Sequence, residues 1–150
     1  MAGGSVLLVS CSKSKKAGEV KYPAEVLYNS PLFKKSRAYA KCYYSNWYIL
    51  SAKHGLLAPQ THIKPYDLTL NELSVSERRT WSVSVSIELT KACEPGTKFV
   101  ILAGKAYSFY LAPILCDLGF SVSLPLEGKG IGQRLAWLNN EIAEWTENAT

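Results

Sequence analysis

Lys53 and His54 directly follow an apolar strand signal, Trp47 to Leu50, in the segment SAKHG. His54 can exchange protons near neutral pH, and Lys53 can hold a phosphate or a developing negative charge. The alternative is an ordinary turn whose histidine hydrogen-bonds a loop backbone. Ligands of parallel sheets, however, lie outside the carboxyl ends of the strands. We therefore interpret Lys53 and His54 as candidate catalytic groups and Ser51, which opens the segment, as a candidate ligand contact.

A second polar segment, CSKSKK, follows the aliphatic run SVLLVS. Ser10, Ser12 and Lys13 can hold a phosphate or the polar edge of a base, with a solvated basic loop as the alternative. The segment is no Walker loop, because it lacks the glycines and the GK[ST] ending of that motif. Cys11 is a candidate ligand contact or nucleophile, although a buried structural thiol is the commoner outcome.

Asp67 is one of two aspartates and lies in the long irregular segment HGLLAPQTHIKPYDLTLNELS. Its carboxylate can act as a general base or stabilise a cationic transition state, or it can simply cap a turn. Tyr66 beside it can stack on a base. His62 lacks a position at a strand end and is interpreted as a loop residue. Long segments without regular structure are often functional, so Asp67 is the main candidate for a catalytic carboxylate, with Glu127 and Glu25 in reserve.

Two glycine-containing turns precede later helices. In AGKAY, Gly104 would let a ligand approach the positive end of a helix, and Tyr107 would point from the first helical turn. In PLEGKGIGQRLAWL, Gln133 and Arg134 lie in the first helical turn and could contact a polar ligand. GKGIG does not match GxGxxG and is a weak sign of a phosphate loop. For both segments the alternative is an ordinary connection.

The chain contains four cysteines without paired spacing, two histidines and two aspartates. No single element carries these residues at metal-ligand spacing, so we expect no metal site and no cofactor. A signal peptide and an apolar run long enough to span a bilayer are both missing from the sequence pattern. We therefore expect a cytoplasmic protein with reduced thiols and no membrane partner.

Four strands and four helices are expected to position these side chains. Aliphatic runs predict strands at SVLLVS, NWYILSA, KFVILAG and FSVSLPL. A helix over 31–43 is predicted with Ser30 as its N-cap. The capping box of Ser74 and Glu77 opens another helix, which runs to about residue 93.

The pattern of the second helix is contested, because its SVSVS alternates like a strand. Trp81, Val85, Leu89 and Ala92 nevertheless line one helical face. A third helix follows Gly104 and ends at Gly119. The last helix is the clearest, because apolar residues repeat at helical spacing at Ile131, Leu135, Leu138, Ile142 and Trp145.

This alternation of strands and helices predicts an α/β fold that forms a single domain over residues 1–150. We expect three layers, with a mostly parallel central sheet of about four to five strands and helices on both faces. The strand-end segments CSKSKK, SAKHG and AGKAY should then converge at one edge of the sheet.

The overall charge indicates an anionic partner. The formal net charge is +5 at pH 7 and the isoelectric point is about 9.0. This charge suits DNA or a nucleotide, although many soluble proteins are mildly basic.

Several segments together carry a family resemblance: VSCSKSKK, LYNSPLFKKSRAYA, WYILSAKHGLLAP, PYDLTL, LAGKAY and PLEGKGIGQRLAWL. They resemble a small uncharacterised domain family of bacteria and phages, distantly similar to YaaA-type peroxide-stress DNA-binding proteins and to a domain of archaeosine-type RNA modification enzymes. The resemblance implies a context of nucleic acid and modified bases. The chain is shorter than YaaA and has no obvious helix-hairpin-helix segment. The family-like polar positions are Ser10, Cys11, Ser12, Lys13, Ser51, Lys53, His54, Tyr66, Asp67, Gly104, Tyr107 and Gln133.

The favoured hypothesis is an enzyme that breaks a nucleobase N-glycosidic bond in DNA or in a nucleotide, as a DNA glycosylase does. Asp67 would stabilise the sugar cation or activate water, and Lys53 and His54 would assist the departing base. The alternative is a non-catalytic module that binds a nucleotide or nucleic acid in a stress response or in phage–host conflict. A basic scaffold whose polar loops serve only turns is the third possibility.

Overall fold

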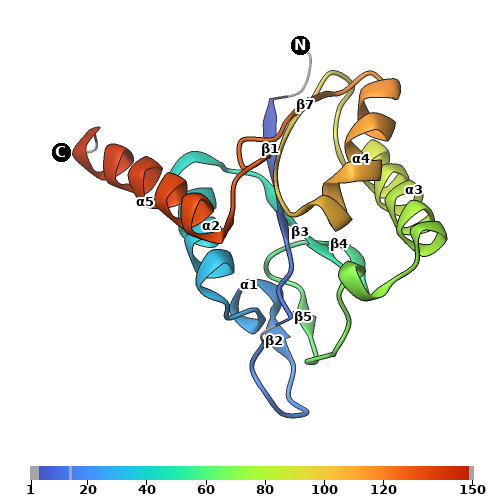
Figure 1. The fold of residues 1–150 in the computed structure, drawn as a ribbon, viewed down its shortest axis with the longest axis horizontal. Coiled ribbons are helices and arrows are strands. Elements are labelled where there is room, and N and C mark those ends of the chain that lie inside the picture. The colour runs from blue at the N-terminus through green and yellow to red at the C-terminus, as the bar shows by residue number, and fades with distance from the viewer. Residues whose placement is uncertain (1–3, 14, 149–150) are drawn as a thin grey trace.

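The computed structural model of the chain describes residues 4–13 and 15–148. Its main sheet has five strands in the order β4-β3-β1-β6-β7. Four strands run parallel, and only β4 pairs antiparallel, with β3. The predicted mixed α/β class with a mostly parallel sheet is confirmed (Figure 1). In sheet order the strands are Gly55–Leu57 (β4), Trp47–Ser51 (β3), Ser5–Ser10 (β1), Lys98–Leu102 (β6) and Ser121–Ser123 (β7).

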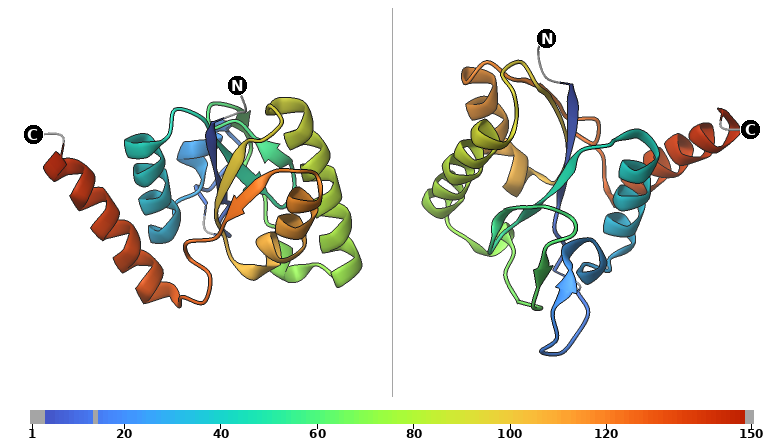
Figure 2. Two further views of the ribbon diagram at one scale, coloured as in Figure 1. Left: turned by 90° about the horizontal axis from the view of Figure 1, so that it is seen from above. Right: turned by 180° about the vertical axis from the view of Figure 1, so that it is seen from behind.

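Helices cover both faces of this sheet. α2 and α5 pack together on one face, and α3 and α4 pack together on the other (Figures 1 and 2). The central strand β1 is therefore covered on both faces. Its consecutive residues Leu7 and Leu8 point to opposite faces, and both are fully buried. The helices are Pro31–Tyr43 (α2), Val75–Ala92 (α3), Lys105–Asp117 (α4) and Ile131–Asn148 (α5).

The predicted caps fix where two of these helices begin. The Ser30 hydroxyl accepts a hydrogen bond of 3.1 Å from the Phe33 N–H, at the start of α2. Ser74 and Glu77 form the predicted capping box of α3, with each side chain accepting from the other residue's N–H. The alternating SVSVS of α3 is helical, because the helix buries Trp81, Val85 and Leu89 of the predicted face. Ala92, the fourth residue predicted on that face, is exposed at the end of the helix.

Short elements in the long connection were not predicted. After β4 the chain forms β5 (His62–Ile63), which pairs with β2 (Tyr22–Pro23), and the 3-10 helix η1 (Leu70–Glu72). A further short helix, α1 (Ala24–Leu27), follows β2. Because β2 and β5 lie about forty residues apart and each has only two residues, neither carries a local strand pattern.

Helix α5 lies at the margin of the fold and packs chiefly against α2. Leu138 is fully buried, whereas Ile131 and Trp145 at the two ends are 61 % and 41 % exposed. Figure 2 shows the C-terminal part of α5 extending past the body of the molecule. The predicted apolar stripe is therefore only partly covered. Of the helices within 4–13 and 15–148, none has the length and apolar character needed to cross a bilayer.

The chain reverses direction across the sheet between β1 and β6. From β1 it passes through α2 to β3, and from β6 it passes through α4 to β7 on the opposite side. The loops after the two strands therefore leave toward opposite faces and open a crevice at their carboxyl ends. In open α/β sheets this switch point is where ligands bind.

Gly55 directly follows Lys53 and His54 and is the first residue of β4. Its backbone has a φ of 71°. A Cβ atom at this position would lie 2.7 Å from the Glu88 Oε1 atom. We expect Gly55→Ala to lower the free energy of unfolding by about 1–2 kcal/mol, since alanine rarely adopts this left-handed conformation. Urea denaturation followed by circular dichroism measures the change. Gly132→Ala, inside α5 with open space around the new methyl group, should cause no loss.

Candidate functional site

Two adjoining pockets open at the switch point. The β6 pocket has a volume of about 530 Å³ and lies among β6, α4 and the loop before α5. The β1 pocket, of about 320 Å³, lies at the carboxyl ends of β1 and β6. Both are lined by Ala103 and Arg134, so they adjoin there. The polar residues that line the β6 pocket include Lys105, Ser108, Glu127 and Lys129, and those that line the β1 pocket include Ser10, Ser12 and Ser30. Most of the remaining lining of the β1 pocket is apolar, with Leu32, Phe33, Leu102, Leu126, Ile131 and Leu135 among it.

The starts of three helices lie at these pockets. Ser30 at the start of α2 and Ile131 at the start of α5 line the β1 pocket, and Lys105 at the start of α4 lines the β6 pocket. The helix dipole makes each helix start favourable for an anion. At α2 the dipole acts with few free donors, because Pro31 has no N–H and Ser30 already accepts from the Phe33 N–H. Arg134 adds a charged group that borders both pockets.

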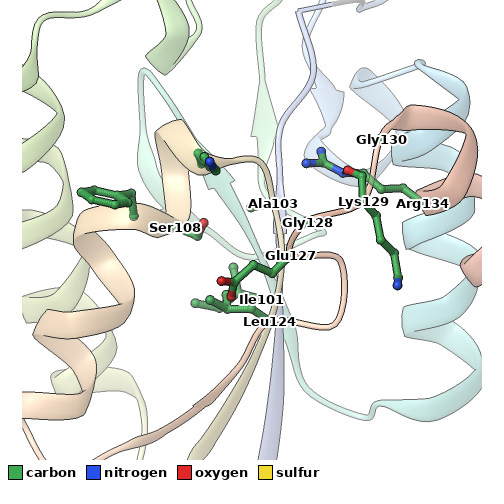
Figure 3. A pocket seen from close by; sticks show the side chains of 11 residues that line it. Ile101, Ala103, Ser108, Leu124, Glu127, Gly128, Lys129, Gly130 and Arg134 are labelled. Atoms are coloured by element: carbon green, nitrogen blue, oxygen red, sulfur yellow. The ribbon is translucent and has the colours of Figure 1, made fainter.

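Glu127 and Arg134 enter the β6 pocket from different segments (Figure 3). The Glu127 side chain turns inward toward Ile101 and Leu124, whereas Lys129 points away. The Arg134 Nε donates a 2.9 Å hydrogen bond to the Lys129 carbonyl, which holds the guanidinium in place. The pocket thus combines an apolar floor with one carboxylate and one anchored cation.

A buried chain of hydroxyl groups lies beside these pockets, at the ends of β1 and β3. The Tyr66 hydroxyl lies 2.6 Å from the Tyr28 hydroxyl and 2.7 Å from the Ser51 hydroxyl. Ser51 is fully buried, and its hydroxyl oxygen also accepts a hydrogen bond of 3.0 Å from the backbone N–H of His54. We call Tyr28, Ser51 and Tyr66 the tyrosine cluster. Ser51 therefore positions Tyr66 and His54 from below the surface.

Cationic side chains surround the Tyr66 ring. The Lys15 Nζ lies 4.5 Å from its centroid and the Lys53 Nζ lies 5.8 Å away, both within the range of cation–π attraction. The His54 ring meets Tyr66 edge-on at 5.4 Å. A backbone bridge pairs Lys15 with Tyr28, which explains how the loop after β1 brings its lysine to this ring.

Burial shifts the pKa values of the two tyrosines of the cluster and of Lys15 and His54 beside it. It raises the pKa of Tyr66 and of Tyr28 above the usual tyrosine value, so both phenols stay neutral and can donate. Burial lowers the pKa of Lys15, against the opposing effect of Cys11 and nearby carboxylates. Partial burial, followed by the charge of Lys53, lowers the pKa of His54. At pH 7 the histidine is therefore predominantly neutral.

Asp67 is exposed and faces the lysines of the loop after β1. Lys13 forms an ion pair of 2.9 Å with Glu72, and Glu72 first and Asp67 second raise its pKa. Asp67 also acts on the pKa of Lys15. Asp67 lines neither switch-point pocket. Its carboxylate instead interacts with Lys13 and Lys15, which lie in the loop after β1.

Cys11 connects the β1 pocket to the tyrosine cluster. Its sulfur lies 3.2 Å from the Tyr107 hydroxyl, which in turn accepts a 3.3 Å hydrogen bond from the Leu70 N–H. The Tyr107 ring packs edge-on against Trp81 at 5.5 Å, and the Trp81 indole donates a 2.9 Å bond to the Ser51 carbonyl. Cys11 and Tyr107 are both buried, so this contact fixes β1, α4 and the 66–70 segment to one another.

The three strand-end segments lie at one edge of the sheet, as their sequence positions predicted. Ser10 and Ser12 line the β1 pocket, and Gly104 caps α4, where a Cβ atom would lie 3.8 Å from the Arg134 guanidinium. Gln133, in the first turn of α5, instead accepts a 3.0 Å hydrogen bond from the backbone N–H of Gly130, just before that helix. The catalytic and binding roles of all these residues stay predictions.

The structure adds residues that sequence reasoning missed. Tyr28 sits in an unremarkable run, and nothing local indicated its bond to Tyr66. Phe109 lines the β6 pocket, although the pattern of α4 marks it only as an exposed position. Lys15 was visible as one of a series of lysines, but only its bridge to Tyr28 singles it out. Within 4–13 and 15–148, no three histidine, cysteine or acidic side chains gather as metal ligands.

Comparison with known proteins gives the family. Residues 6–140 match the model of a family described as a family of unknown function, DUF6884. The chain belongs to this family. A Bacillus subtilis (strain 168) protein described as uncharacterized protein YfjM is 32 % identical over an alignment of 151 residues. The alignment covers 91 % of this chain and 94 % of that protein. The matched range includes both pockets and the tyrosine cluster, so the whole sheet edge lies inside the family domain. The similarity to YaaA-type proteins stays a prediction.

The tyrosine cluster yields a stability prediction. Tyr66→Phe removes one hydroxyl that serves both Tyr28 and Ser51. We expect the free energy of unfolding to fall by about 1–3 kcal/mol, because two buried hydroxyl groups lose a partner. Urea denaturation measures this loss. Tyr110→Phe, at a position outside the cluster, should change stability by less than about 0.5 kcal/mol. If Tyr66→Phe lowers the free energy of unfolding no more than Tyr110→Phe does, the hydroxyl chain does not stabilise the fold.

Proposed function

We propose that this protein binds a nucleotide or a nucleic-acid segment at the carboxyl edge of its sheet. The observation that carries the proposal is the convergence of three helix starts and Arg134 on two adjoining pockets at the switch point. Helix starts and an arginine fork are suited to phosphate oxygens. The proposal places the protein in the cytoplasm, where nucleotides are available.

The lining of the site also favours a ligand with chemically different parts. The β1 pocket combines the hydroxyl groups of Ser10, Ser12 and Ser30 with apolar side chains, and the β6 pocket combines an apolar floor with Lys105, Glu127 and Arg134. A nucleotide has a phosphate and a flat heteroaromatic base, which match this mixture of charged, hydroxyl and apolar groups. The net charge of +5 and the resemblance of the motifs to DNA-binding and RNA-modifying families favour the same class of ligand.

Arg134→Ala tests this proposal. We expect the Kd for nucleoside monophosphates and for a short fluorescent single-stranded oligonucleotide to rise at least about tenfold, since a charged hydrogen bond contributes roughly 1.5–3 kcal/mol. Titration calorimetry and fluorescence anisotropy at several salt concentrations measure the change. Arg79→Ala is the matched control, because Arg79 lies on α3 over the Tyr110 ring, outside both pockets. Wild-type protein that binds neither ligand class would end the proposal.

A second candidate function is release of a base from its sugar. It is favoured by the gathering of Lys15, Lys53 and His54 around Tyr66, with Asp67 adjacent in sequence. Water would attack the anomeric carbon as the C–N bond breaks, and the Asp67 carboxylate would stabilise the sugar cation or take the proton from water. The departing base would accept its proton from a lysine, because the lowered pKa leaves His54 neutral at pH 7.

Asp67→Asn separates this reaction from binding alone. We expect base release, measured by chromatography of free base after incubation with nucleotides and oligonucleotides, to fall by about 100-fold or more while the Kd stays within a few-fold. Asp117→Asn, at the exposed end of α4, is the matched control. Full release by Asp67→Asn would eliminate this mechanism. If wild-type protein binds nucleotides without releasing base, the non-catalytic module is the correct function.

A further inference from the structure

We propose that the β6 pocket holds the base of the ligand and that Glu127 selects a base with the hydrogen-bonding edge of guanine. This inference rests on the proposed nucleotide-binding function and adds the identity of the base. Neither the family match nor the relative assigns a ligand to this pocket.

The dimensions and lining of the β6 pocket suit a flat heterocycle. Its volume of about 530 Å³ falls in the usual range for small-molecule sites. Ile101, Ala103 and Leu124 supply apolar surface, and Phe109, which is 62 % exposed, supplies an aromatic ring at the same pocket. An aromatic ring is a general platform for stacking on any base, so these groups favour a base without choosing which one.

Glu127 supplies the carboxylate among the described residues that line this pocket. A carboxylate only accepts hydrogen bonds, and its two oxygens match two parallel N–H donors. Guanine presents such a pair, a ring N–H beside an exocyclic amine. Adenine and cytosine place a ring acceptor next to their amine, and that nitrogen would repel the carboxylate. Uracil and thymine offer a single N–H between two carbonyl groups.

Backbone hydrogen bonds order the turn that carries Glu127. The Glu127 N–H donates a 3.1 Å bond to the Leu124 carbonyl, and the Lys129 N–H donates a 3.1 Å bond to the Leu126 carbonyl. Leu126 is only 2 % exposed and anchors this turn in the core. A preordered turn reduces the entropy lost when a ligand binds, and the exposed Glu127 side chain extends from this turn into the pocket.

Arg134 fixes the direction in which the ligand lies. Its Nε is occupied by the Lys129 carbonyl, while its terminal nitrogen lies near Gly104 at the start of α4. Since Arg134 borders both pockets, a base in the β6 pocket places its sugar and phosphate beside the guanidinium. The phosphate then faces the β1 pocket and the start of α2.

A panel of nucleotides tests this assignment directly. We expect GMP to bind at least about tenfold more tightly than IMP, which lacks the exocyclic amine, and more tightly than AMP, CMP or UMP. The same order should hold for short oligothymidylates carrying one central guanine or hypoxanthine. Glu127→Gln should reduce the GMP preference over IMP to about threefold or less, because the amide accepts only one such bond.

Glu144→Gln, on the exposed C-terminal part of α5, is the matched control and should keep the full preference. Titration calorimetry gives the Kd ratios, and circular dichroism checks that each variant is folded. Nucleotide binding without a guanine preference, or a preference that survives Glu127→Gln, would overturn this inference alone. Failure of the wild-type protein to bind any nucleotide or oligonucleotide would overturn the proposed function as well.

Discussion

The reversal of the chain between β1 and β6 is the constraint on which the rest of the structure depends. Because the loops after these strands leave toward opposite faces, neither can cover the carboxyl end of the other, and a crevice stays open there. The same reversal places the starts of α2 and α4 at the crevice, and the loop after β7 brings the start of α5 there as well. The position of the crevice and the helix starts around it are therefore consequences of topology, and side chains such as Arg134 and Glu127 supply its charged groups.

The polar edge divides into an ordered part and an open part. In the ordered part, Tyr66 and Ser51 satisfy each other's hydroxyl groups, and Cys11 and Tyr107 connect β1 to α4. Buried hydroxyl groups are costly without partners, so such a network holds the three segments in one arrangement. In the open part, the two pockets keep their charged groups available to a ligand. A rigid base beneath an accessible surface is what a selective site requires.

Local patterns predicted the elements well where the signal was contained in a few neighbouring residues. The α2 cap at Ser30 and the capping box at Ser74 were readable, because a cap needs only residues within one helical turn. The buried run of β1 was readable for the same reason. The β2–β5 pair and the bridge between Lys15 and Tyr28 were not, because each depends on residues brought together from distant parts of the chain.

The sequence by itself determined the α/β class, the helix starts and the placement of polar segments at strand ends, because these follow from hydrophobic periodicity and local hydrogen bonding. Only the tertiary structure decided which of those polar residues share a cavity. It buried Ser51 and Tyr107 as positioning groups, left Asp67 outside the pockets, and brought Glu127 and Arg134 into one of them. The reason is that strand order and loop direction, which set the neighbours of each side chain, are properties of the packed sheet and are not encoded in any single segment.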